Sequence, residues 1–159
     1  MAIVIRKAIR EDRSALNQLL SKINVFDAED RAIAIELLDI YLEDPAQEDY
    51  KFSVAFDNDS QMVGYICYGP TPLTEGTYDL YWIAVDPQHA GQGVGTLLMR
   101  QLESLVKANH GRLVVIETSS SQQYVLTRQF YLKNGYVLAE TIKDFYRPGE
   151  DRVTFVKYF

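Results

Sequence analysis

Three glycines, Gly91, Gly93 and Gly95, alternate with other residues directly before a predicted helix. The first turn of a helix leaves four backbone N–H groups without intrahelical partners, and the helix dipole adds partial positive charge there. Glycine lowers helix stability by about 1 kcal/mol relative to alanine. Three of them at one helix entrance therefore indicate that another group approaches the backbone closely. The pattern favours phosphate binding, and a loop that only needs positive φ is the alternative.

The residues around the glycines argue against two common classes of phosphate site. A P-loop carries Gly-Lys-Ser/Thr, and no lysine follows here. A dinucleotide fingerprint needs GxGxxG, but Thr96 and Leu98 stand where the third glycine would fall. Glu117 lies where the ribose-binding acid of that fold would lie, yet residues 86–90 separate the preceding strand from the glycines. A nucleotide-binding α/β protein is therefore the least favoured interpretation.

The glycines are flanked by a predicted strand and a predicted helix. Residues 78–85 are aromatic and β-branched, as in a strand, and Pro87 ends the run. Apolar residues from Val94 to Val106 recur at helical spacing. The continuous apolar run 113–116 is typical of a parallel strand that is covered on both faces. Together these segments predict a right-handed strand–helix–strand unit.

The remaining pattern predicts a mixed α/β fold in one domain, residues 1–159. Its central sheet has about seven strands and is flanked by about four helices. The other strands are expected over residues 2–8, 51–56, 61–68, 136–142 and 152–159, and the other helices over 10–23, 27 or 29 to 42, and 124–134.

Composition excludes several classes of function. The formal charge of −6 argues against a nucleic-acid footprint, which should be basic. The single cysteine, Cys67, excludes an internal disulfide, and His89 and His110 are too far apart in sequence to suggest a metal site. No leader and no membrane-spanning run is seen, so we expect a cytoplasmic protein that binds neither metal, membrane nor nucleic acid.

Two segments resemble motifs of the GNAT superfamily of acyl-CoA N-acyltransferases. Ala90–Thr96, which follows Ile83–Pro87, is similar to the family signature Arg/Gln-x-x-Gly-x-Gly/Ala, with Ala90 as a departure at the Arg/Gln position. Phe130–Tyr136 is similar to the family's Phe-Tyr-x-x-x-Gly-Phe/Tyr motif. The ending Asp144–Asp151 also looks like many bacterial members. The resemblance covers most of the chain and implies a GNAT fold.

The resemblance implies an N-acetyltransferase that uses acetyl-CoA. It would transfer the acetyl group to a primary amine of a small molecule or peptide, by direct attack in a ternary complex. The family's pyrophosphate site falls on the amides of Gln92, Gly93, Val94, Gly95 and Thr96, and its pantetheine contacts fall on the backbone of Ile83, Ala84 and Val85.

Three residues are candidates for proton transfer. Tyr131 matches the family tyrosine that acts as general acid, and its alternative role is a core aromatic. Asp79 lies where some members keep a glutamate base, and strand alternation would place it on one face with Tyr81, Ile83 and Val85. Glu117 is the rival base, Asp86 is less favoured, and loss of the amine proton to bulk water is the remaining alternative.

A non-catalytic acyl-CoA-binding or sensing module with the same fold is the rival function. Ala90 favours it, whereas Tyr131 and Asp79 favour an enzyme. Exposed aromatic residues on the last hairpin would suit a homodimer. The sequence does not name the acceptor amine, because fold does not specify substrate.

Overall fold

The computed structural model describes residues 2–159 and has one seven-stranded sheet with four α-helices. The strand order is β1-β2-β3-β4-β5-β7-β6, and only the β4–β5 pair is parallel. This confirms the predicted mixed α/β class. The strands are β1 (Val4–Lys7), β2 (Lys51–Phe56), β3 (Met62–Pro70), β4 (Thr77–Val85), β5 (Leu113–Ser119), β6 (Val137–Arg147) and β7 (Glu150–Tyr158), and the helices are α1 (Arg13–Ser21), α2 (Ala28–Glu43), α3 (Val94–Ala108) and α4 (Val125–Lys133).

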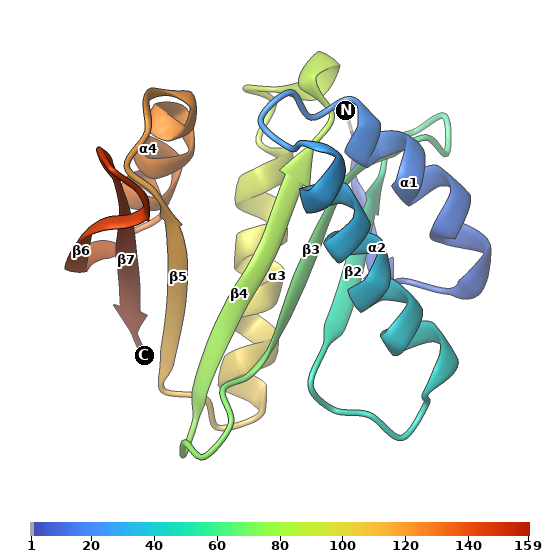
Figure 1. The fold of residues 1–159 in the computed structure, drawn as a ribbon. Helices are drawn as coiled ribbons and strands as arrows, with labels where there is room; N and C mark the ends of the chain where they lie inside the picture. Colours follow the sequence, from blue (N-terminus) through green and yellow to red (C-terminus); the bar gives the residue numbers. More distant parts are fainter. Residues whose placement is uncertain (1) are drawn as a thin grey trace.

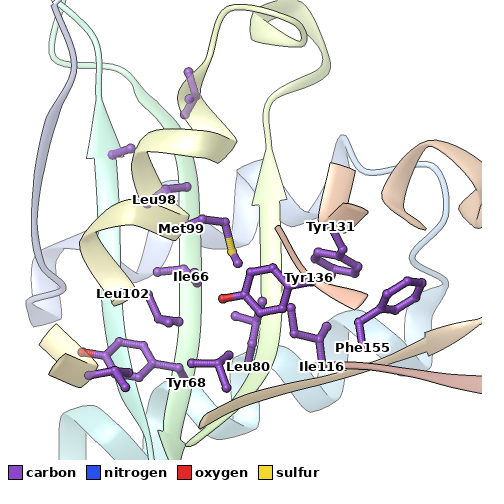
Figure 2. Packing of buried hydrophobic residues seen from close by; sticks show 14 of the residues in the cluster. Ile66, Tyr68, Leu80, Leu98, Met99, Leu102, Ile116, Tyr131, Tyr136 and Phe155 are labelled. Atoms are coloured by element: carbon purple, nitrogen blue, oxygen red, sulfur yellow. The ribbon is translucent and has the colours of Figure 1, made fainter. Parts of the chain in front are cut away.

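Helices cover both faces of the sheet (Figure 1). One apolar cluster holds Leu16 of α1 and Leu38 of α2, packed against the inner strands. The other holds Leu98 and Leu102 of α3 together with Tyr131 of α4 (Figure 2). α1 and α3 each bury an apolar stripe against the sheet, which is the usual source of helix stability in a domain. No helix within residues 2–159 is long and apolar enough to cross a membrane.

The parallel pair β4–β5 is joined only over its first half. Thr77–Leu80 pair with Leu113–Ile116, and pairing stops there although both strands continue. Figure 1 shows the two strands side by side at one end and apart at the other. Beyond Leu80, β4 stays paired with β3 through Val85, and β5 stays paired with β7 through Ser119. The facing edges of Tyr81–Val85 and Glu117–Ser119 are therefore open to other partners.

A β-bulge at Tyr81 corrects the predicted face of β4. Cys67 pairs with Trp82 and Tyr68 pairs with Leu80, so Tyr81 is an extra residue in β4. An extra residue reverses the alternation beyond it. Leu80, Ile83 and Val85 accordingly belong to the α3-side cluster, and Trp82 and Ala84 belong to the α1/α2-side cluster. The prediction that Asp79 shares a face with Ile83 and Val85 is wrong, because it assumed a regular strand.

The last hairpin is longer than predicted, since only Pro148 and Gly149 lie between β6 and β7. Asp144 extends the hairpin toward this turn: its carboxylate accepts the Gly149 N–H at 2.8 Å, and its own N–H donates to Asp151 Oδ1 at 2.9 Å. β6 is the outer strand, and all its residues are exposed. The homodimer expected through this hairpin stays a prediction.

Candidate functional site

Two cavities meet at the end of β4. The interstrand cavity, about 510 Å³, lies between the open halves of β4 and β5 and extends to α4, the α1–α2 loop and the last hairpin. The glycine-loop cavity, about 640 Å³, lies between the end of β4, residues 89–96 and α4. Ile83, Ala84, Val85 and Thr127 line both. Both volumes are in the range of small-molecule sites.

The glycine-loop cavity contains the start of α3. Gly93 is the N-cap residue, with a φ of 86° and no side-chain cap, and Gly91 has a φ of 75°. A Cβ on either residue would have nothing within 4 Å, so backbone conformation accounts for these glycines. Close packing, and not backbone conformation, accounts for Gly95, because a Cβ there would lie 3.0 Å from the Phe130 ring. The uncapped first-turn amides of α3 are available to an anion.

No carboxylate lines the glycine-loop cavity, within the part of the chain that the structure describes. Its lining includes Lys133 and His89, and the His89 Nε2 lies 3.6 Å from Asp57 Oδ2 in the β2–β3 turn. Sequence reasoning missed Leu126, Phe130 and Lys133 as lining residues. Their helical spacing, which puts them on one face of α4, is a signal that could have found them.

The interstrand cavity has the opposite charge character. Four carboxylates line it, from the start of α2, from β5 and from β7: Asp27, Asp30, Glu117 and Glu150. Arg147 is the one lining cation among residues 2–159, and it is paired with Glu150. Six aromatic rings complete much of the wall: Phe26, Tyr81, Trp82, Tyr124, Tyr131 and Tyr146. An acidic, aromatic wall suits a cation.

Tyr131 belongs both to the core and to the interstrand cavity. Its ring is 5.9 Å from Phe155 and 6.5 Å from Tyr136, centroid to centroid (Figure 2). The residue is only 5% exposed, and it lines the cavity. Among residues 2–159 its hydroxyl has no hydrogen-bond partner. Burial raises the pKa of Tyr131 above the ordinary phenol value, so the phenol keeps its proton at neutral pH.

The structure brings Glu117 into the same cavity as Tyr131, but not Asp79. Glu117 Oε1 lies 3.6 Å from Arg152 Nη1, and its side chain is about half exposed (52%). Asp79 Oδ2 accepts hydrogen bonds from Thr71 Oγ1 at 2.8 Å and from Tyr81 Oη at 3.4 Å. Burial, and then the charge of Asp79, raise the pKa of Tyr81 to about 12. Asp79 thus reaches the cavity only through Tyr81.

The last hairpin supplies lining residues that sequence reasoning missed: Tyr146, Arg147 and Glu150. Ser119 Oγ donates to Glu150 Oε1 at 2.6 Å, which fastens the hairpin to the end of β5. The segment Asp144–Asp151 contains all three residues, and its resemblance to bacterial family members was a signal that could have found them. That resemblance alone assigned no chemical role to the segment. Residues 2–159 contain no group of three or more His, Cys, Asp or Glu side chains that could hold a metal ion.

Comparisons with known proteins agree with this architecture. Residues 48–138 match the family model for the acetyltransferase (GNAT) domain. An uncharacterised N-acetyltransferase of Methanocaldococcus jannaschii is 30% identical over 103 residues, which are 62% of this chain and 61% of that relative's length.

Solved structures match over almost the whole chain. A crystal structure described as a candidate GNAT-family acetyltransferase of Desulfovibrio desulfuricans is 37% identical, covers 99% of both chains and has a TM-score of 0.94. The PaiA N-acetyltransferase of Thermoplasma acidophilum, solved with coenzyme A, has a TM-score of 0.79 at 21% identity and covers 100% of both chains, which shows a shared fold. The family match over residues 48–138, and the 37% identity over 99% of the chain, show that this protein belongs to the GNAT acetyltransferase family.

Proposed function

We propose that the protein is an N-acetyltransferase that transfers the acetyl group of acetyl-CoA to a primary amine of a small molecule or peptide. The transfer occurs by direct attack in a ternary complex. One observation carries the proposal: two cavities of opposite charge character meet at Ile83–Val85, beside the buried phenol of Tyr131. An anionic cosubstrate and a cationic acceptor can therefore approach the same point from two sides.

The glycine-loop cavity is the proposed site for CoA. The amides of residues 92–96 would hold the pyrophosphate at the positive end of the α3 dipole. Lys133 adds a positive charge to the same cavity, and this charge compensates for the side chain that Ala90 lacks. The pantetheine arm would pair with Ile83–Val85, whose edge toward β5 has no strand partner.

The interstrand cavity is the proposed site for the amine. The acceptor enters as an ammonium ion and must first lose one proton, because only a neutral amine attacks the thioester. A C–N bond then forms to the thioester carbon and the C–S bond breaks. The nitrogen loses a second proton as the amide forms, and the departing thiolate gains one. Glu117 is the proposed acceptor of the amine proton, directly or through water, because it lines this cavity. Tyr131 is the proposed donor to the sulfur. Burial raises the pKa of Tyr131, and the same burial would raise the pKa of a thiol that departs beside it.

The first test is a calorimetric titration of the purified protein with acetyl-CoA, with NAD as the control ligand. We expect micromolar binding of acetyl-CoA, no binding of NAD, and release of free thiol when a suitable amine is added. Absence of acetyl-CoA binding would overturn the proposal. Binding of acetyl-CoA without turnover of any amine would favour the acyl-CoA-sensing module instead.

A further inference from the structure

We infer that the amine acceptor carries a second positively charged group, and that Asp27 and Asp30 bind it at the start of α2. The inference rests on the proposed function, because it assigns the interstrand cavity to the acceptor. It names the substrate class as compounds with at least two amino or guanidino groups. The reacting amine lies near Tyr131 and Glu117, and the second group lies against α2.

Asp27 and Asp30 are held in place by each other's backbone. The Asp30 N–H donates to Asp27 Oδ1 at 2.8 Å, and the Asp27 N–H donates to Asp30 Oδ2 at 3.0 Å. Each carboxylate keeps a second oxygen outside this reciprocal cap. The hydrogen bond from the Asp30 amide lowers the pKa of Asp27, so this carboxylate is charged at neutral pH. Two fixed charges bind a cation with little loss of side-chain entropy.

These are also the lining carboxylates that have no cationic partner. Glu150 is paired with Arg147, and Glu117 lies 3.6 Å from Arg152. Within residues 2–159 neither Asp27 nor Asp30 forms an ion pair, and the nearby Arg31 donates to the Phe26 carbonyl at 2.8 Å. The cavity therefore holds a negative charge that its own side chains do not neutralise.

The aromatic wall beside these carboxylates suits an alkylammonium group. Phe26 and Trp82 line the cavity and pack edge to face, with ring centroids 5.1 Å apart. Tyr124, which precedes α4, also lines the cavity. Burial raises the pKa of Tyr124, and the nearby charges of Asp30, Glu150 and Asp27 raise it further. Tyr131, which is 5% exposed, lines the same cavity and marks its proposed reacting end. A diamine would satisfy both ends.

The test compares amines of equal length. Thiol release is measured with acetyl-CoA and α,ω-diamines of three to six carbons, with the matching alkyl monoamines, and with the matching ω-amino acids, all at one ionic strength. We expect kcat/KM for the best diamine to exceed that of its monoamine at least tenfold, with the amino acid lowest. Equal values for diamine and monoamine would overturn the inference and leave the proposed function intact. Lack of turnover with every amine would overturn both.

Variants assign the effect to the two carboxylates. Asn is as good an N-cap residue as Asp, so Asp27→Asn removes the charge and keeps the cap. In Asp30→Asn the amide oxygen can still accept from the Asp27 N–H. We expect each to raise the KM of the diamine about tenfold, and to lower kcat/KM of the diamine several-fold more than that of the monoamine. Glu29→Gln, in the same first turn but outside the cavity lining, is the control and should change neither. An equal loss for diamine and monoamine would contradict the inference.

Discussion

At the scale of single residues, Tyr131 combines packing and chemistry in one ring. It is 5% exposed, contacts the rings of Phe155 and Tyr136, and lines the cavity assigned to the acceptor. The sequence left a catalytic residue and a core residue as alternatives, and the geometry is compatible with both. Removal of the hydroxyl distinguishes the two roles, because phenylalanine at this position would preserve the packing.

We expect Tyr131→Phe to lower kcat at least tenfold, because loss of a positioned general acid costs that much or more. The Kd of acetyl-CoA and the melting temperature should stay near wild type. Tyr136→Phe is the matched control: this phenol is also buried, but it donates to Glu103 Oε2 at 3.1 Å and does not line the cavity. A Tyr131→Phe variant with wild-type kcat would end the general-acid assignment.

Gly93 can be tested in the same way, because its Cβ would meet no protein atom. Gly93→Ala strains a residue with a φ of 86°, which costs about 1–2 kcal/mol of stability. We also expect at least a tenfold rise in the Kd of acetyl-CoA, since the methyl group enters the space proposed for the pyrophosphate. Gly149→Ala imposes similar strain, at a φ of 85°, in the β6–β7 turn. If both variants weaken acetyl-CoA binding equally, the effect is one of stability and not of the cradle.

At the scale of elements, the divergence of β4 and β5 separates the two carboxylates proposed as base. Pairing stops at Leu80 and Ile116, so Glu117 is the first β5 residue beyond the paired region. Asp79 lies within the paired half of β4, and Thr71 and Tyr81 hydrogen bond to its carboxylate. The geometry therefore favours Glu117.

The pH–rate profiles of Glu117→Gln and Asp79→Asn separate the two candidates. We expect Glu117→Gln to lower kcat/KM at least tenfold and to abolish the acidic limb of the profile. Asp79→Asn should keep that limb, because the amide oxygen can still accept from Thr71 and Tyr81. The reverse result would assign the base to Asp79 acting through Tyr81. An unchanged limb in both variants would mean that bulk water takes the amine proton.

Local patterns predicted the fold well, and they predicted less of the site. The glycine loop and Tyr131 could be identified because their motifs are contiguous in sequence. The bulge at Tyr81 could not, because it depends on how β4 pairs with β3. Asp27 was predicted only as a helix start. Its place in a cavity depends on where the start of α2 lies relative to the open halves of β4 and β5, which no local pattern contains.

At the scale of the whole molecule, two buried carboxylates fasten the ends of α1 to the sheet. Asp12 is its N-cap residue and accepts two hydrogen bonds from Arg6 of β1, at 2.7 and 2.9 Å. Lys22 is its C-cap residue and donates at 2.9 Å to Asp86, which follows β4. Asp12 and Asp86 are both buried. Two ionised side chains therefore add to the apolar packing that holds α1 against the sheet.

The pKa values of these carboxylates give the direction of the acid response. Burial alone would raise the pKa of Asp12, but hydrogen bonds from Arg6 and the Ile9 amide outweigh it and lower the pKa. Burial likewise opposes the lowering at Asp86, where the Gln88 amide and Lys22 prevail. A lowered folded-state pKa stabilises the protein above the unfolded value of about 3.9, and that stability is lost as pH falls through the folded pKa.

We expect Asp12→Asn to lower the free energy of unfolding by about 2 kcal/mol at pH 7, the size of a charge-assisted hydrogen bond. The gap between wild type and variant should shrink as pH falls below about 4, because the unfolded state then takes up a proton that folded Asp12, with its lowered pKa, does not yet bind. Urea unfolding at pH 7, 4 and 3 measures both. Asp39→Asn is the control, since Asp39 pairs with Arg13 at the surface, where ion pairs contribute less. A gap that stayed constant across this range would show that Asp12 stabilises α1 by its shape and not by its charge.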